Sequence, residues 1–348
     1  MTKSTRYLAF GSAAIVVFGL CTGLVAYYGG IPSLTASRVG PPELALVPAD
    51  ASIVAFADVR DVMDSELRQK LREALPGDQK KREELQRLTG IDIERDIDRV
   101  VAAVGADAEH SVVAFLSGRF NPTQIESLAR QHGGEVVDYG GKRLIRGMRP
   151  KHPDNHSVAT ARVHGTAHAA KADVHPHSGD DSPALAFIEP NVLAIGAETA
   201  VKRAIDTQKS GQNITTNGDV MKIISSVATG NNVWAVGRMD HFVSRLPQEV
   251  AMRMPPIQWF AATGRVNGGI HASLRAEAVD DQAAENLRDV VRGGLALVKM
   301  QSADPKMASL AQSIRLEGSG KTVSVSFTVP AELIDLLLAK GPRGLVQN

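Results

Sequence analysis

SIVAFADV, residues 52–59, is the stretch from which the fold of this chain can be worked out. It is short and apolar, it follows the turn-forming triplet Pro-Ala-Asp at 48–50, and a helical pattern begins just after it at Asp61. A short apolar run bounded in this way predicts a β-strand. A second run of this kind, NVWAVGRM, occupies residues 232–239. The chain therefore has two places at which a sheet is expected to begin.

Strand pairs and amphipathic helices are predicted after each of these runs. Gly140-Gly141 and Asn267-Gly268 each separate two strand-like segments, and such dipeptides favour the tight turns of β-hairpins. The expected hairpins span residues 135–146, 184–196, 258–278 and 312–329. The expected helices include residues 198–209, 218–227 and 280–300.

The order of these elements is similar in the two parts of the chain. This order predicts an α+β fold made of two related halves, residues 49–229 and 230–340, followed by a tail at 341–348. Each half is expected to be a mainly antiparallel sheet with helices packed on one face. The hypothesis of two halves depends on element order and not on residue identity.

An unbroken apolar run precedes all of this, from Tyr7 to Tyr28, and no charged residue lies between Arg6 and Arg38. A helix over these residues would be roughly 33 Å long, enough to cross the hydrocarbon core of a bilayer. A cleaved signal peptide is the alternative, but its apolar region is ordinarily only about 7–15 residues long. The run therefore predicts a transmembrane helix at residues 7–28.

The charges beside this run predict its orientation. Lys3 and Arg6 precede it, so the positive-inside rule places residues 1–6 in the cytoplasm and the bulk of the chain outside it. Residues 29–48 are rich in Pro and Gly and are expected to form a semi-extended tether. The Ala-rich composition is typical of bacteria, which would make the location the inner membrane, with the bulk of the chain in the periplasm.

The composition excludes several classes of partner and of stabilising bond. Lys and Arg number 39 against 38 Asp and Glu, so the basic excess that a nucleic-acid partner requires is missing. Aromatic residues make up 4% of the chain, which disfavours stacking platforms for bases. Cys21 is the single cysteine and falls inside the apolar run, so stability must come from core burial.

Sequence motifs for catalysis are weak. The segment GSGKT at 318–322 resembles the end of a phosphate-binding loop, but Arg315 stands where that motif requires Gly, and the alternating segment VSVSFTV follows instead of a helix. We therefore interpret it as a hairpin turn. A hydrolase with a dispersed Ser-His-carboxylate site stays open, because such residues can be distant in sequence.

A His-rich segment at residues 150–182 interrupts the hairpins and is expected to be a disordered insertion, since it has few large apolar residues. Its histidines are candidate ligands for Zn, Cu or Ni, and the pair at 164 and 168 would share a helix face. The candidates are His152, His156, His164, His168, His175 and His177. The alternative is a polar surface loop with only adventitious metal affinity, and no dedicated cofactor is expected.

Two segments, PADASIVAFADV at 48–59 and LTGIDIERDIDRVVAAVG at 88–105, give the chain a family resemblance. They resemble uncharacterised, membrane-anchored exported proteins of bacteria whose outer domain begins with Pro-Ala-Asp and an apolar strand. The resemblance implies localisation and fold, and it implies no activity.

Together these features predict a single-pass, membrane-anchored exported protein that is a non-enzymatic binding module of the cell envelope. Its expected partners are the lipid bilayer, through residues 7–28, and an unknown envelope protein. The alternatives are metal binding through the His-rich segment, a dispersed hydrolase site, and carriage of an apolar ligand between sheet and helices.

Overall fold

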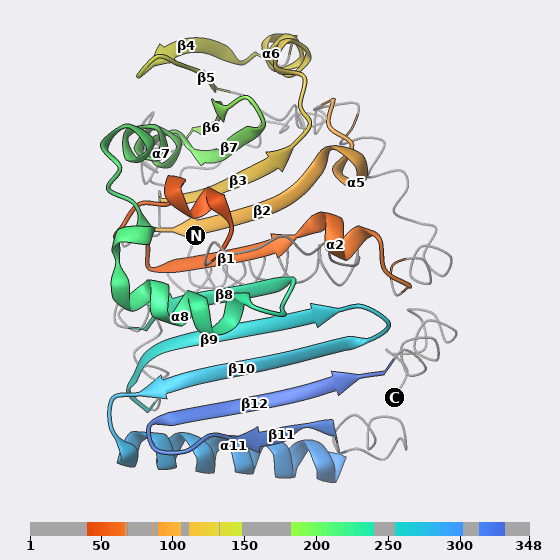
Figure 1. Cartoon of the computed structure of the whole chain (residues 1–348), viewed down its shortest axis with the longest axis vertical. Helices are drawn as coiled ribbons and strands as arrows, with labels where there is room; N and C mark the ends of the chain where they lie inside the picture. Colours follow the sequence, from red (N-terminus) through yellow and green to blue (C-terminus); the bar gives the residue numbers. More distant parts are fainter. Residues whose placement is uncertain are drawn as a thin grey trace, which may run out of the picture.

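One antiparallel sheet of 12 strands runs through the described chain (Figure 1). The computed structural model describes residues 40–66, 68, 86, 90–105, 111–131, 133–147, 182–239, 255–301 and 313–330. The strand order across the sheet is β11-β12-β10-β9-β8-β1-β2-β3-β7-β6-β5-β4. The strands are β1 (Ile53–Asp58), β2 (Ile97–Val104), β3 (Val112–Gly118), β4 (Glu135–Tyr139), β5 (Lys142–Arg146), β6 (Pro183–Glu189), β7 (Val192–Ala197), β8 (Val233–Arg238), β9 (Ile257–Val266), β10 (Ile270–Ala278), β11 (Arg315–Glu317) and β12 (Thr322–Val329).

The two apolar runs that predicted the start of a sheet are β1 and β8, and they pair with each other at its centre. Ala55 lies opposite Ala235 in this antiparallel pair. From β1 the sheet continues through β2 and β3 to β7, β6, β5 and β4, and from β8 through β9 and β10 to β12 and β11. On each side, therefore, a three-strand meander leads outward and the later strands return from the edge.

The expectation of a separate sheet in each half was wrong, because the strands form one continuous sheet. The burial of β1 and β8 explains the pairing. Four consecutive residues of β1 and five of β8 are buried, so both faces of each strand are covered. A strand with this pattern belongs in the interior of a sheet, and each of these two strands covers one edge of the other.

Helices lie on both faces of the sheet, which corrects the prediction that they cover one face. The α-helices are α2 (Val59–Met63), α5 (Ile93–Asp96), α6 (Pro122–Gln131), α7 (Glu198–Ser210), α8 (Gly218–Ala228) and α11 (Asp281–Gln301), and the short 3-10 helices are η1 (Pro42–Leu46) and η4 (Ile214–Thr216). The main core holds α7, α8 and η1 against one face, which we call the α8 face. Helices α6 and α11 pack against the other, which we call the α11 face.

Strand sequence explains why both faces are covered. In β6, Ala186 and Ile188 join the core under α7, whereas Leu185 packs with α6 on the opposite face. In β7, Ala194 and Leu193 divide in the same way. Neighbouring residues that are both apolar leave no solvent face, so a helix is needed on each side.

The C-terminal part of the sheet follows a different pattern. On its α11 face, Ala278 and Val323 pack with Ala283 and Ala284 of α11. On its α8 face, strands β10 and β12 carry polar residues. Helix α8 packs on β8 and β9, and no other described helix covers this face at β10 and β12. β10 and β12 therefore alternate between an apolar and a polar face, and the apolar face is itself only partly covered, since Leu274 is 52% exposed.

Most predicted elements that fall in the described ranges are present within one or two residues, including the hairpins at β4-β5 and β9-β10. The last hairpin, β11-β12, begins at Arg315, three residues after its predicted start at 312. The segment GSGKT is the turn between β11 and β12, where the Thr322 amide donates to the Ser319 carbonyl at 3.1 Å. None of the helices in the described ranges is both long and apolar enough to span a bilayer. The predicted transmembrane run at 7–28 lies outside those ranges.

Candidate functional site

A cavity of about 320 Å³ opens on the α8 face, between α8 and the strands β8, β9 and β10. We call it the Arg275 pocket. Its α8 wall includes Val220, Lys222 and Ile223, and its sheet side includes Trp259 and Arg275. It therefore lies where the helix-covered part of this face gives way to the polar part.

The α8 wall is positioned by the start of the helix and by its buried side. The Asn217 side chain caps the helix by accepting a hydrogen bond from the Val220 amide at 3.3 Å. Val220, Ile224 and Val227 are buried against the sheet. This periodicity leaves the side of α8 that carries Lys222 at the pocket.

Strand register places the two principal side chains of the sheet side together. Trp259 lies opposite Glu277, and Arg275 lies opposite Ala261, so Trp259 and Arg275 are diagonal neighbours on the α8 face. The Arg275 guanidinium carbon is 5.3 Å from the centroid of the Trp259 ring. Such a cation-π contact stabilises by about 0.5–2 kcal/mol and keeps the guanidinium beside the indole ring.

Positive charge predominates around the pocket. Lys222, Arg238 and Arg275 line it together with a single acid, Asp219. Asp219 is paired with Lys222 at 3.5 Å. The Arg275 Nε atom is buried without a hydrogen-bond partner in the described chain. The pocket can therefore hold an anionic group against an arginine that has no acidic partner among the described residues.

Next to the pocket lies a row of hydroxyl and other polar groups, which we call the polar face. It consists of His271, Ser273, Thr322, Ser324, Ser326 and Thr328. Cross-strand hydrogen bonds join Ser273 to Ser324 at 3.2 Å and His271 to Thr328 at 3.1 Å. Thr322 also donates from its hydroxyl to Glu277 at 2.7 Å. His271 is exposed and the other five residues are half-buried.

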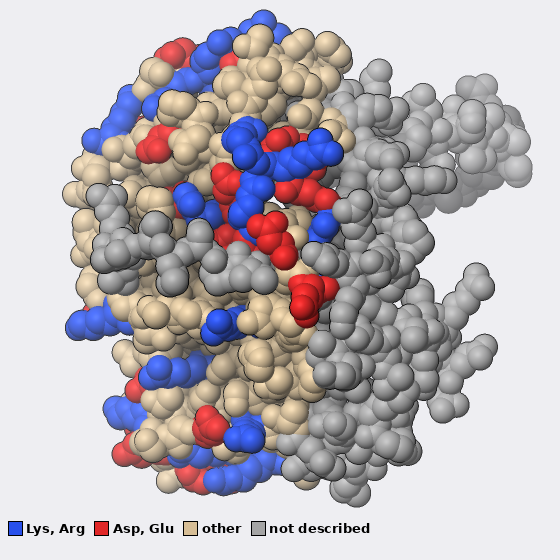
Figure 2. All heavy atoms as spheres, turned by 45° about the vertical axis from the view of Figure 1, so that its right-hand side comes forward, with Lys and Arg blue, Asp and Glu red and all other residues tan. Residues whose placement is uncertain are grey.

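A second polar cluster lies at the other end of the central strands, where β1 and β3 end. Figure 2 shows acidic and basic side chains gathered in this upper part of the molecule. The Glu43 side chain, only 3% exposed, accepts from Arg99 at 2.8 Å and from the Ser117 hydroxyl. These bonds tie η1 to β2 and β3, so the cluster has a structural role.

Two aspartates of this region have perturbed pKa values. Burial raises the pKa of Asp61 from its ordinary 3.8 to about 6, and the nearby charge of Asp58 adds to the rise. Burial likewise raises the pKa of Asp58, which caps α2 by accepting from the Asp61 amide at 2.9 Å. Asn232, just before β8, accepts from the Val266 amide at 3.0 Å and also contacts Asp61. These groups therefore connect α2 to the seam between β1, β8 and β9.

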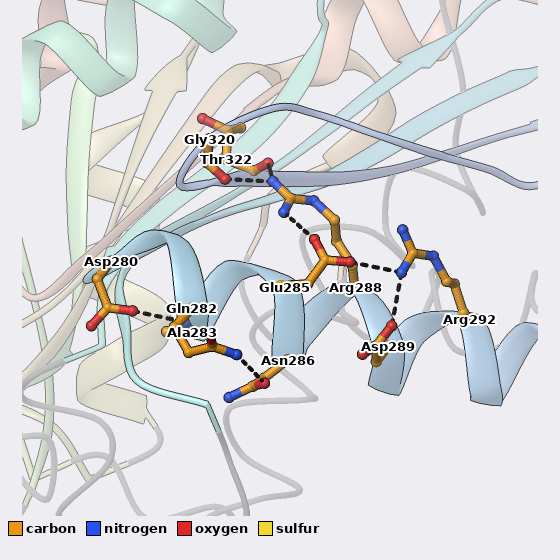
Figure 3. Close-up of polar contacts among 10 residues, drawn as sticks. All are labelled: Asp280, Gln282, Ala283, Glu285, Asn286, Arg288, Asp289, Arg292, Gly320 and Thr322. Atoms are coloured by element: carbon orange, nitrogen blue, oxygen red, sulfur yellow. Dashed lines mark hydrogen bonds and ion pairs between the residues drawn. The ribbon is translucent and has the colours of Figure 1, made fainter.

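A third set of polar contacts fastens α11 to the last hairpin (Figure 3). Arg288 donates to the Gly320 carbonyl, to the Thr322 carbonyl at 3.1 Å and to Glu285 at 2.9 Å. Arg292 donates to Glu285 at 2.9 Å and to Asp289 at 2.7 Å. We call this set the Arg288 clamp. Its contacts are internal, so it holds structure rather than a ligand.

The six histidines predicted as metal ligands all lie outside the described residues, so this hypothesis stays untested. Within the described ranges, no group of three or more His, Cys, Asp or Glu side chains could hold a metal ion. His271, the one histidine of the described chain, bonds Thr328. No sequence motif marks the Arg275 pocket, although the alternation HASLRAEA at 271–278 is a signal for a polar strand face.

Comparison with known proteins adds little. The sequence matches no protein-family model, and no curated protein matches it. A solved structure titled "Structure of crystal form I of TP0453" is similar with a TM-score of 0.40 and 11% sequence identity. The match covers 87% of this chain and 98% of that one.

Proposed function

We propose that this protein is a membrane-anchored, non-enzymatic binding module of the cell envelope, which recognises a partner on the polar face of its sheet. The observation that carries the proposal is the contrast between the two ends of the α8 face. Around β6 and β7 this face is buried under α7, whereas at β10 and β12 it presents polar side chains that no described helix covers.

The sequence supplies the rest of the proposal. The apolar run at 7–28 would hold the chain in the bilayer. The predicted tether at 29–48 is too long at its C-terminal end, because η1 (Pro42–Leu46) and Val47 are buried in the main core. Residues 29–39 would then be the tether that carries the sheet away from the bilayer. The charges before the run favour an outward orientation of the sheet. A bilayer and an envelope protein are then the two partners.

The same strand order on the two sides of the β1-β8 pair supports a further part of the proposal, a relationship between the halves. In each half, a meander of three strands is followed by a helix, α6 or α11, and then by strands that return from the sheet edge. The halves would then be two copies of one unit joined through their first strands. The longer N-terminal unit would carry an extra hairpin.

Site-specific photo-crosslinking in native membranes tests the binding role. A benzophenone amino acid placed at Ser326, on the polar face, is expected to give a discrete crosslinked product. The control position is Gln131, which is exposed at the end of α6 on the other face of the sheet. Equal products from both positions, or none from Ser326, would contradict the proposal.

A further inference from the structure

We infer that the Arg275 pocket is a binding site for a small organic anion, whose carboxylate or phosphate group lies against the Arg275 guanidinium. The apolar part of the ligand contacts α8 and the Trp259 ring. The inference goes beyond recognition of a protein partner on the polar face, and the two can fail separately.

Arg275 is held beside Trp259 at the sheet side of the pocket. Its guanidinium carbon lies 5.3 Å from the centroid of the Trp259 ring, and this cation-π contact restricts the side chain before a ligand arrives. A planar guanidinium offers paired N–H donors that match the two oxygens of a carboxylate or phosphate. Because the ring already restricts the side chain to this side of the sheet, less side-chain entropy is lost on binding.

Arg275 also has a hydrogen-bond donor that is unsatisfied among the described residues. The Nε–H of Arg275 is buried and has no acceptor among the described residues. A buried donor without a partner costs the folded protein about 1–3 kcal/mol. A small rotation of the side chain toward a bound oxyanion would give this donor an acceptor.

The formal charge of the side chains that line the pocket is positive. Asp219, the single carboxylate among the lining residues, is paired with Lys222 at 3.5 Å, and the other charged residues of the lining are Arg238 and Arg275. Oxyanions are attracted to such a site, while organic cations are repelled by it. The surplus of positive charge therefore selects the sign of the ligand.

The size of the pocket and its apolar walls limit the kind of ligand that it can hold. A volume of about 320 Å³ is at the small end for ligand sites and suits a small molecule. Val220, Ile223 and Trp259 give the pocket apolar surface beside its charges. A ligand with one anionic group and a small apolar body matches both features.

Titration of the full-length, ¹⁵N-labelled protein in detergent micelles tests the inference. The chain has two tryptophans, and their indole N–H signals separate the pocket from the core. Trp259 lines the pocket, whereas Trp234 is 1% exposed and serves as the internal reference. The probes are benzoate, phenyl phosphate, acetate, inorganic phosphate, neutral benzamide and the cation benzylammonium.

Benzoate or phenyl phosphate is expected to shift the Trp259 signal with a saturating curve, and the stronger of the two identifies the oxyanion. Benzamide and benzylammonium are expected to leave it unchanged. Acetate and inorganic phosphate are expected to bind at least about tenfold more weakly, because they lack the apolar part. Equal responses to benzoate and benzamide, or to benzoate and acetate, would overturn the inference.

Variants complete the test. Arg275→Gln is expected to weaken binding of the better probe at least about tenfold, and Arg275→Lys to weaken it less, because Lys keeps the charge and loses the paired donors. Arg315→Gln, which removes an exposed arginine from β11, is the matched control and should bind as the wild type does. Unchanged binding in Arg275→Gln would overturn the assignment, even if crosslinking from Ser326 still supported a protein partner.

Discussion

At the scale of single residues, Asp61 shows how a charge is held at an unfavourable place. Its side chain lies at the seam of β1 and β8, where burial and the neighbouring Asp58 raise its pKa to about 6. The folded chain therefore binds the Asp61 proton more tightly than the unfolded chain does. This contribution makes the free energy of unfolding fall as the pH rises from about 4 to about 6.

Asp61→Asn is therefore expected to stabilise the protein at pH 7.5. A shift from 3.8 to about 6 corresponds to a gain on the order of 1–3 kcal/mol, because the amide carries no charge to bury. Urea unfolding of the full-length protein, followed by circular dichroism at pH 4 and pH 7.5, measures it. The variant should also lose much of the fall in stability between these pH values.

Glu317→Gln is the control, since Glu317 is exposed on β11 at the edge of the sheet, whereas the charge of Asp64 contributes to the raised pKa of Asp61. Its free energy of unfolding should stay within about 0.5 kcal/mol of the wild-type value. An Asp61→Asn protein that is less stable than the wild type at pH 7.5 would show that the carboxylate is stabilised at this seam, contrary to our interpretation.

At the scale of elements, the C-terminal hairpin depends on α11 for more than apolar contact. Leu316 and Val323 pack on this helix, and the Arg288 clamp adds bonds from a side chain only 12% exposed. The clamp bonds the turn GSGKT at 318–322, which resembles the end of a phosphate-binding loop but lacks its first glycine. A hairpin turn held by an arginine needs neither the missing glycine nor a following helix.

Arg288→Gln is expected to loosen this hairpin selectively. The Gly320 and Thr322 carbonyls lose their charged donor, at a cost of about 1–3 kcal/mol to local stability. Hydrogen exchange measured by mass spectrometry should rise in peptides that cover residues 313–330. Peptides from β2 and β3 should be unaffected, because these strands lie across the central pair from the hairpin.

Arg292→Gln provides the comparison on the same helix. Arg292 is 55% exposed and contacts only acids of α11 in the described structure, so its loss should change exchange in the hairpin little. Similar exchange in the two variants would contradict the view that Arg288 is the residue that fastens the hairpin.

At the scale of the whole molecule, local sequence patterns predicted the strands and helices well, but they did not predict which distant strands pair in the sheet. Alternation and turn dipeptides predicted β9 and β10, since a hairpin is decided by residues close in sequence. The pairing of β1 with β8 joins segments about 180 residues apart, and local propensity carries no information about it. The burial of both strands on both faces became visible only in the assembled sheet.

The same reasoning explains what the sequence missed at the candidate site. The Arg275 pocket is built from one helix and three strands, and the contact between Trp259 and Arg275 depends on the register of β9 with β10. Alternation in β10 could have predicted that Arg275 faces away from the core. It could not have predicted that α8 packs beside Arg275 and forms the other wall of the pocket.

The central claim is that the sheet lies outside the cytosol behind a helix that stays in the membrane. Labelling of engineered cysteines in intact protoplasts with a membrane-impermeant maleimide tests it most directly, with Cys21 replaced by Ser to remove the native thiol. We predict that a cysteine at Gln131 reacts without lysis, that one at Thr2 reacts only after lysis, and that the full-length protein stays in the membrane fraction. A cysteine at Gln131 that reacts only after lysis, in a protein recovered from the soluble fraction, would contradict the account.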